Sequence, residues 1–579
     1  MENRVTKLWE MYQKGLNYQN NIDLIYKSNE AVDFLDGKQW PDTTDRTKNL
    51  PRPVFNIIEL IVNNKRANVL SSKIKMVFKP VEIAKSNSEE ITKKADKFTK
   101  FAEYIANDLE QDELNHEAIT DGFTKGMYCY HYFWNSEKAG ASSKYQGGLD
   151  GEIIDPLNII FANPNIIDEQ KQKWILIKSR ESVKALKELA KKNKVPDIDL
   201  ITSDYKDEDN YDIEEQDNEE YATVLTRYFR VGGEVYFEKA TKSSIIQPAT
   251  KLTPDTSRLT IKDGNIIEDE VGTNPDVPEK EKYKISLYPV IVGRYMKKKG
   301  CIYGQGLVEK LISQQKSINF NYAMLLLAGQ NVGFPKTIVT PDALEGQEIT
   351  NTPGEVLVDY DRARGGIRYL EAPTFSPVIM NLIDNIIDKT RSFNGATEVV
   401  SGEVLGANMS GSAIAALQTQ AKVPIEVIQR QFWNVHRKIA KVWEQFFKTY
   451  YNDNRSFIYT SESGEKVQET FNGEEEQDIE FATNIEIGAG SLYSEAAGIS
   501  FLEKLYADKV ITADEYIELY PDNLVPYKNT LKKMREKKKL PEEVEQAILA
   551  NPDLLNSIMN LLQGGEANGQ QQVPVNMQQ

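Results

Sequence analysis

The chain has 579 residues, of which 27% are charged and 40% are hydrophobic, a balance typical of a folded protein. Its 87 acidic and 70 basic residues give a net charge of −17 at pH 7. Proteins that bind duplex DNA tightly carry a basic face, so this charge argues against tight DNA binding. It still allows a surface past which DNA slides without sticking.

The N-terminal part of the chain alternates predicted helices and strands. Apolar residues at helical spacing predict helices over 18–37, 54–70 and 88–113. Strands are predicted near Met76, in the aromatic run that starts at Met127, and in the apolar segments around Ile159 and Trp174. No apolar run approaches the ~20 residues that a bilayer requires, so no contact with a membrane is expected.

An acidic tract over 204–220 interrupts this pattern. It lacks the glycine and the terminal glutamate of a calcium-binding loop, which favours a solvated loop. Two alternating segments follow on either side of Gly232 and Gly233, and this arrangement predicts a two-stranded hairpin.

The second half is more helical. Helices are predicted over 304–330 and 376–393, on either side of a turn-rich segment that resembles a small α/β module. The longest helix is predicted from Ser412, with a near-heptad apolar seam and a bend at Pro424. Strands, further helices and a polar tail complete the chain.

No pattern in the sequence indicates catalysis. The loop with Gly402, Gly406 and Gly411 lacks the lysine of a phosphate-binding Walker motif. The 2 cysteines and 3 histidines are not at metal-ligand spacing, so no metal, cofactor or disulfide framework is expected. Asp384 and Asp388 lie four residues apart, a spacing that suits acid–base chemistry but more often marks a solvated helix face.

Two lysine-rich clusters, Lys297 to Lys299 and the segment from Lys532 to Lys539, stand out against the acidic composition. Either could contact nucleic acid, although an exposed, lysine-rich helix end is the commoner explanation. Neither alternates with aromatic residues in the manner of a single-strand binder.

Several segments in a fixed order carry a resemblance to a known family. They are FLDGKQWP, RPVFNIIELIVNNKRANVL, PVIVGRYMKKKGCIYGQGLVEKLISQQKSIN, SGEVLGANMSGSAIAALQTQAKVP and the later GAGS. Together they resemble the portal proteins of tailed bacteriophages. The resemblance implies a non-enzymatic ring of twelve subunits at one capsid vertex, through which the terminase motor pumps DNA in and from which DNA later leaves.

The resemblance also implies a predominantly α, α+β fold with portal architecture. Its expected parts are a wing (1–303), a first stem helix (304–330), a clip (331–375), a second stem helix (376–393), a tunnel loop (394–411), a kinked helix with a β segment (412–499), a crown (500–562) and a disordered tail (563–579). Expected partners are further copies of the chain, the terminase large subunit, major capsid and scaffold proteins, head-completion and tail adaptor proteins, and double-stranded DNA held without sequence specificity. The expected location is the virion, after assembly in the host cytoplasm.

Three sets of residues follow from this comparison. The tunnel loop would line the channel with Thr397, Glu398, Ser401, Glu403, Asn408 and Ser410; it has no basic residue, which argues against a grip on phosphates. The stem would face the channel with Asp384, Asp388, Lys389 and Arg391. The clip would dock the terminase with Asp342, Glu345, Glu348, Asp359, Asp361, Arg362 and Arg364. The alternative is a head or tail assembly protein that forms no channel.

Overall fold

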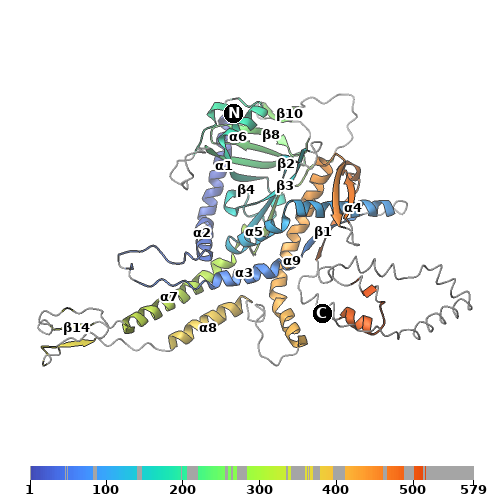
Figure 1. Cartoon of the computed structure of the whole chain (residues 1–579). Coiled ribbons are helices and arrows are strands. Elements are labelled where there is room, and N and C mark those ends of the chain that lie inside the picture. Colours follow the sequence, from blue (N-terminus) through green and yellow to red (C-terminus); the bar gives the residue numbers. More distant parts are fainter. Residues whose placement is uncertain are drawn as a thin grey trace, which may run out of the picture. The chain divides into compact units, whose positions relative to one another are not determined.

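The computed structural model describes residues 2–45, 47–48, 50–81, 88–139, 146–196, 198–204, 220–254, 258–262, 265–269, 283–333, 337–340, 348, 359–361, 363, 366–369, 378–395, 411–460, 466–487, 501–512, 515–516 and 519. The chain divides into two compact units. The first comprises Met1–Tyr459 and Gln468–Gly490, and the second comprises Thr460–Val467 and Ser491–Gln579. Helix and sheet are mixed in the first unit, as an α+β fold requires (Figure 1).

A seven-stranded antiparallel sheet forms one end of the first unit (Figure 1). Its spatial order runs backwards along the chain through β10 (Asn265–Asp269), β9 (Arg258–Lys262), β8 (Ile245–Lys251), β7 (Glu234–Ala240), β6 (Tyr221–Val231), β5 (Trp174–Ser182) and β4 (Ile159–Phe161). The predicted hairpin is confirmed, because β6 and β7 pair up to Val231 opposite Glu234. Gly232 and Gly233 have φ values of 58° and 87°, the left-handed conformation that such a tight turn requires. The short helix α6 (Val183–Lys192) follows β5 and packs against β8.

The N-terminal helix α1 (Glu2–Asn21) packs on this sheet. The indole Nε1 of Trp9 donates to the carbonyl of Thr241 at 2.9 Å. Arg4 of α1 and Arg227 of β6 each approach the buried carboxylate of Glu238 to 2.6 Å. Burying one carboxylate between two guanidinium groups satisfies its charge, so these ion pairs fix α1 to the sheet.

A second, three-stranded sheet, β11–β2–β3, lies in the main core. Its strands are β2 (Met127–Ala139), β3 (Gln146–Ile154) and β11 (Val290–Arg294). Helices α5 (Gln111–Thr124) and α9 (Gly411–Tyr450) pack against it. The predicted seam of α9 is confirmed where side chains are described, because Ile428 is partly buried and the other members are buried: Ile425, Phe432, Val435, Ile439, Val442 and Phe446.

A pair of distant strands closes this core. β1 (Ile74–Pro80) pairs antiparallel with β18 (Phe481–Ile487), which joins segments some 400 residues apart. Helix α4 (Ser88–Asp108) covers the pair, and β16 (Arg455–Thr460) forms a small sheet with β17 (Lys466–Phe471). Phe101 of α4 stacks on Phe471 with ring centroids 3.9 Å apart.

Two long helices extend from the core as an antiparallel pair (Figure 1). They are α7 (Leu307–Gly333) and α8 (Val378–Phe393), and the small pair β14 (Thr337–Val339) and β15 (Ile367–Tyr369) lies between them in sequence. The base of α7 packs against α2 (Leu24–Leu35), α3 (Ile57–Val69) and α5. The short hairpin β12 (Met296–Lys298) to β13 (Cys301–Gln305) leads directly into α7.

The sequence pattern was wrong about two helix boundaries. The helix predicted over 18–37 is two helices, α1 and α2, because Asp23 has a left-handed φ of 56°. The helix predicted over 88–113 is also two, α4 and α5, because Glu110 has a φ of 49°. A left-handed residue ends the helical hydrogen-bond ladder. Neither residue is a glycine, so no local pattern in the sequence indicates either break.

Apart from the strand ends at Thr460 and Lys466, the described part of the second unit is a short helical segment. Residues 501–507 form helix, and Lys509 has a left-handed φ of 58°. The hydroxyl and amide of Thr512 both contact Glu515 Oε2, at 2.9 and 2.7 Å. The Glu515 amide in turn donates to Thr512 Oγ1 at 3.3 Å, which is the reciprocal pattern of a capping box.

Candidate functional site

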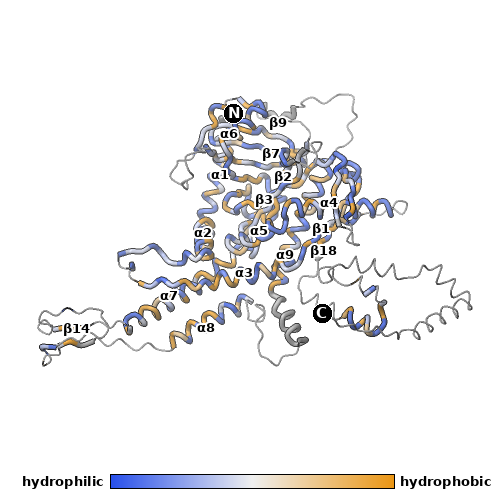
Figure 2. Tube along the Cα trace, viewed as in Figure 1, coloured by the Kyte–Doolittle hydropathy of each residue, from blue (hydrophilic) through white to orange (hydrophobic). Residues whose placement is uncertain are grey.

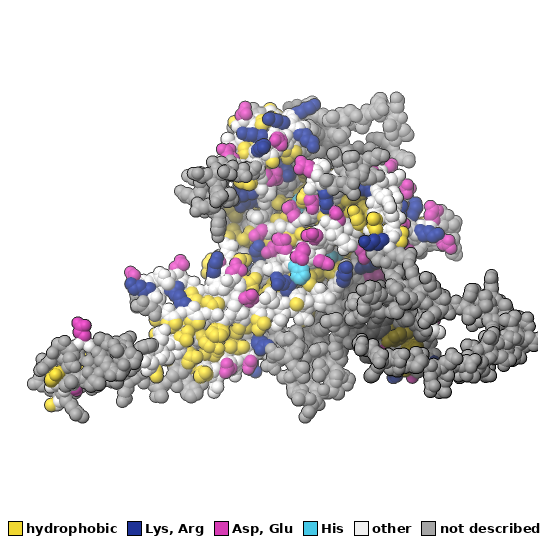
Figure 3. All heavy atoms as spheres, viewed as in Figure 1, with side chains coloured by type: hydrophobic (Ala, Val, Ile, Leu, Met, Phe, Trp, Pro, Cys, Tyr) yellow, Lys and Arg dark blue, Asp and Glu magenta, His cyan; other side chains and the backbone are white. Residues whose placement is uncertain are grey.

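The α7–α8 pair exposes many large apolar side chains. Phe320, Met324, Leu326 and Val332 of α7 and Val378, Met380, Leu382 and Phe393 of α8 are all exposed, and Phe393 is 84% exposed. Figure 2 shows hydrophobic residues along both helices, and Figure 3 shows hydrophobic side chains gathered on the visible face of this part of the molecule. Contiguous apolar surface of this kind marks a place where another protein surface packs.

The base of α7 is held rigidly by a buried amide network. Asn319 Nδ2 donates to Gln39 Oε1 at 2.6 Å, and the backbone amide of Ile57 donates to Gln315 Oε1 at 3.1 Å. Phe55 stacks on Tyr322 with centroids 4.0 Å apart. These contacts tie α7 to the ends of α2 and α3, so the exposed part of the helix projects from a fixed base.

The four predicted stem residues do not all lie on the same side of α8. Asp384, Asp388 and Arg391 occur at intervals of four and three, so they share one side of the helix. Asp384 and Asp388 are exposed, and Arg391 is partly buried. Lys389 is also exposed, but its side chain lies about 100° around the helix axis from Asp388, closer to the direction of Leu382. The structure therefore brings the two carboxylates and Arg391 together but not Lys389. Two exposed carboxylates without a histidine fit the solvated helix face rather than an acid–base pair.

Two of the predicted clip residues organise a turn. Asp359 Oδ1 accepts from the amide of Asp361 at 3.1 Å, and its Oδ2 accepts from the amide of Ile367 at 3.3 Å. Asp361 Oδ2 accepts from the Thr340 hydroxyl at 3.0 Å. Both carboxylates are therefore largely engaged within the β14–β15 module. Glu348, by contrast, is exposed. The other four clip residues, Asp342, Glu345, Arg362 and Arg364, lie outside the described residues.

The tunnel-loop residues also lie outside the described residues. They are Thr397, Glu398, Ser401, Glu403, Asn408 and Ser410. The structure resumes at Gly411 with the first turn of α9, and the residues on the other side of the loop end at Gly395, at the close of α8.

Burial changes the pKa of two titratable groups in the helices of the core. His436 is buried in α9, with Nε2 3.0 Å from Asn115 Oδ1 and Nδ1 3.1 Å from the Phe432 carbonyl. Burial lowers the pKa of His436 to about 4, so the ring is neutral at pH 7. His436 is therefore a packing residue of the core. Burial also lowers the pKa of Lys65 on α3 to about 8.

Neither a metal centre nor a membrane span is found where the structure can be described. In the ranges given above, His, Cys, Asp and Glu do not gather in groups of three or more that could hold a metal ion. The helices within those ranges are also too short or too polar to cross a bilayer.

Comparison with known proteins identifies the class of this molecule. A family model described as phage P22-like portal protein matches residues 11–492, which is most of the chain and includes the α7–α8 pair. No curated protein matches the sequence. The coverage shows a phage portal protein, and the chain belongs to the P22-like portal family.

Family membership sets the coarse function. Portal proteins of this family are structural proteins rather than enzymes, they associate with copies of themselves, and they form part of the virion capsid. The apolar surface of α7 and α8 is consistent with self-association. Sequence reasoning missed the buried amides Gln39, Gln315 and Asn319, whose partners are far away in the sequence and left no local signal.

Proposed function

We propose that this chain forms a closed dodecameric ring at one capsid vertex, and that the ring is the channel for packaging and ejecting the phage genome. The observation that carries the proposal is the exposed apolar surface of the α7–α8 pair. Leu382 and Phe393 are eleven residues apart on α8, about three turns, so they lie on the same side of that helix. In a ring, this side packs against the α7–α8 pair of the next subunit, which removes its apolar area from water.

The opposite side of α8 lines the channel in this proposal. Asp384 lies about 160° around the helix from Leu382, so packing Leu382 against a neighbour directs Asp384 and Asp388 away from that contact. Twelve copies would surround the channel with rings of carboxylates. Carboxylates repel DNA phosphates, so DNA slides through without sticking, while Arg391 on the same side adds sparse positive charge. Lys389 lies on the side of Leu382 and does not face the channel in this arrangement.

The remaining parts take the roles that the family resemblance implies. The segment 331–375 serves as the clip that docks the terminase large subunit and later the head-completion and tail adaptor proteins. Its docking face includes the exposed Glu348, whereas Asp359 and Asp361 support it from within. The tunnel loop, 394–411, lines the channel, and the wing and crown contact major capsid and scaffold proteins. Assembly takes place in the host cytoplasm.

Negative-stain images and a sedimentation mass of the purified full-length protein test the ring. We expect rings with an open centre and a mass of twelve subunits. The variant Leu382→Gln with Phe393→Gln should give fewer rings, because both side chains are exposed in the single subunit and contribute to the contact between subunits. Its single-subunit unfolding temperature should not change. Filaments, solid discs or stable monomers from the unaltered protein would favour an assembly protein without a channel.

The matched control lies on the other side of the same helix. Asp384→Asn with Asp388→Asn should leave the rings intact, because these carboxylates do not face the neighbouring subunit. It should, however, increase the retention of DNA by the rings at low salt, because two phosphate-repelling charges per subunit are lost. Loss of rings in this control would place the aspartates at the subunit contact and would contradict the proposed orientation.

Terminase docking has its own test. Deleting Thr337 to Arg368 and joining the two helices through a short glycine linker should preserve rings and abolish binding of the terminase large subunit. Unchanged terminase binding by this variant would place the docking surface outside the clip.

A further inference from the structure

A cavity at the start of α7 gathers an unusual number of lysines. It has a volume of about 360 Å³ and is lined by Lys27 of α2, Lys125 after α5, and Lys297, Lys298 and Lys299 of the β12–β13 hairpin. Glu309 is the sole carboxylate among its lining residues. In a chain with a net charge of −17, this concentration of positive charge is a strong local departure.

Two of the five lysines are already paired with carboxylates. Lys27 lies 3.4 Å from Glu309, and Lys125 lies 2.9 Å from Asp121 and 2.8 Å from Asp155. These pairs largely cancel the charges of the inner wall. The cavity therefore depends on its other three lysines for a net positive potential.

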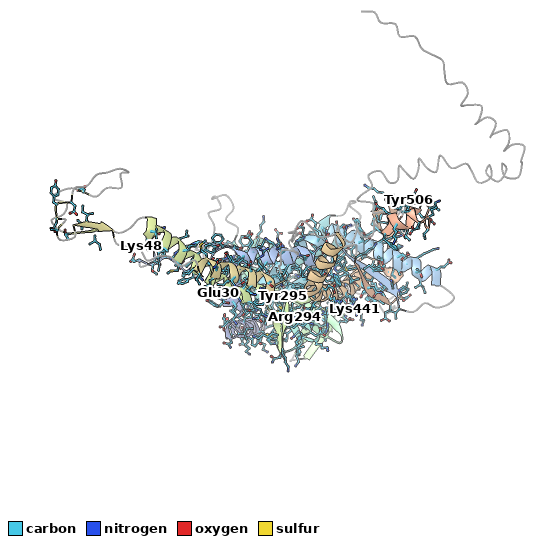
Figure 4. All side chains as sticks on the ribbon, turned by 90° about the horizontal axis from the view of Figure 1, so that it is seen from below. Glu30, Lys48, Arg294, Tyr295, Lys441 and Tyr506 are labelled. Atoms are coloured by element: carbon cyan, nitrogen blue, oxygen red, sulfur yellow. The ribbon has the colours of Figure 1, made fainter. Side chains whose placement is uncertain are left out.

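The three lysines of the hairpin lack such compensation. Lys297, Lys298 and Lys299 are exposed, and no carboxylate in the described ranges forms an ion pair with any of them. Arg294 ends β11, and Tyr295 links it to the hairpin; both are labelled in Figure 4. The turn is completed by Gly300, with a φ of 69°. Three adjacent cations therefore stand at the cavity with their charges available to a ligand.

The start of α7 adds a second, independent source of positive potential. Gly304, Gln305 and Gly306 line the cavity, and α7 begins at the next residue, Leu307. The first turn of a helix has backbone N–H groups without partners inside the helix, and its dipole favours an anion there. Helix N-termini are for this reason frequent phosphate-binding sites.

Close packing fixes this end of the helix in place. A Cβ atom added to Gly304 would lie 2.1 Å from the Gly126 carbonyl oxygen, and one added to Gly306 would lie 2.3 Å from the Thr124 carbonyl oxygen. The backbone that enters α7 therefore lies directly on the end of α5. Because this backbone is already fixed, binding an anion does not carry the entropy cost of ordering it.

We propose that this cavity is a phosphate-binding site, formed by Lys297, Lys298 and Lys299 together with the N-terminal end of α7. The ligand is a phosphate group, either of a DNA backbone or of free phosphate. The assignment of duplex DNA as the source of the phosphate rests on the proposed channel function. The existence of the phosphate site does not depend on that function. Lysine recognises phosphate as a point charge without reading bases, which suits contact with a genome of any sequence.

The test compares two variants of the full-length protein with identical charge changes. The first is Lys297→Gln, Lys298→Gln and Lys299→Gln. The control is Lys537→Gln, Lys538→Gln and Lys539→Gln, in the other lysine-rich cluster. Both change the net charge by −3. The control residues lie outside the described residues, so circular dichroism and electron microscopy check that folding and rings are retained in both variants. Binding is measured with inorganic phosphate by calorimetry and with a labelled 20-base-pair duplex by fluorescence anisotropy.

We expect the hairpin variant to lose binding to phosphate and to weaken duplex binding at least tenfold at low salt. The slope of log K against log salt should fall by about 2 to 3, because each lost phosphate contact removes about 0.9 from it. The control should behave as the unaltered protein does. If the hairpin lysines are required for binding inorganic phosphate but not for binding the duplex, the cavity binds free phosphate and does not contact DNA.

Two outcomes would overturn the site itself. One is equal binding of both probes by the hairpin variant and the control. The other is loss of rings in the hairpin variant with unchanged phosphate binding, since the lysines would then contact an acidic segment of a neighbouring subunit, such as 204–220. Neither outcome bears on whether the unaltered protein forms rings with an open centre, so failure of this site is distinguishable from failure of the proposed channel.

Discussion

Asn319 on α7 donates a hydrogen bond of 2.6 Å to Gln39, a residue 280 positions earlier that lies in the turn after α2. Both side chains are buried, and Gln39 also donates to the Phe34 carbonyl at 2.8 Å. Buried amides need partners because an unpaired one loses its hydrogen bonds to water without replacement. This contact therefore fixes where the long helix leaves the core.

Replacing Asn319 by leucine should destabilise the first unit by about 1 to 3 kcal/mol, because Gln39 Oε1 is left buried without its donor. Thermal and urea unfolding measure the loss. The control is Asn321→Ala, two residues further along α7, where the side chain bonds only to the Ser317 carbonyl of the same helix. An equal loss in both variants would contradict the role assigned to the Asn319 contact.

The pH dependence of stability should include a contribution from His436. Its pKa is about 4 in the folded chain and about 6.5 when unfolded. Between these values the unfolded state binds more protons, so the stabilisation is complete above about pH 6.5 and is lost as pH falls towards 4. His436→Gln should remove this part of the pH dependence, so the difference between the urea midpoints of the unaltered protein and the variant should change from pH 7 to pH 5.

The exposed His116 supplies the control for this measurement. His116→Gln changes the same residue type on the surface of α5, so its urea midpoint should follow that of the unaltered protein across this range. Parallel curves for His436→Gln and the unaltered protein would show that burial does not hold His436 neutral.

The ion pairs of Glu238 should be essential for attaching α1 to the large sheet. Glu238→Gln removes the carboxylate shared by Arg4 and Arg227 and leaves two partly buried cations without it. We expect a loss of about 3 to 5 kcal/mol and faster proteolysis within α1. Lys239→Gln on the same strand breaks only the more exposed pair with Glu181 and should cost less than about 1 kcal/mol. Protection of α1 in Glu238→Gln would show that apolar contacts alone hold this helix.

Two glycines near and within α7 should respond oppositely to alanine. Gly304→Ala places a methyl group 2.1 Å from the Gly126 carbonyl oxygen, so the backbone must shift, at a cost of about 1 to 3 kcal/mol. Gly329→Ala meets no atom within 4 Å and should stabilise the helix by about 0.5 to 1 kcal/mol. Thermal unfolding of both variants provides the measurement. A neutral Gly304→Ala would show that the start of α7 is free to move from the end of α5.

The local pattern of the sequence predicted the elements whose stability depends on near neighbours. The seam from Ile425 to Phe446 identified α9, and Gly232 with Gly233 identified the β6–β7 hairpin. For α8, apolar spacing placed the helix within two residues of its observed start. The acidic pair Asp384 and Asp388 shares one side of α8 for the same reason, since helical geometry alone determines it.

Only the tertiary structure decided which distant segments meet. The pairing of β1 with β18, the contact of Asn319 with Gln39, and the meeting of Lys27, Lys125 and the hairpin lysines at the start of α7 join residues that are far apart in the chain. Such contacts depend on shape, burial and the entropy of closing long loops, none of which leaves a periodic signal in the sequence. The sequence by itself determined the positions of α8 and α9 and which residues share one side of a helix, whereas tertiary packing decided which polar groups are buried and where the lysines gather.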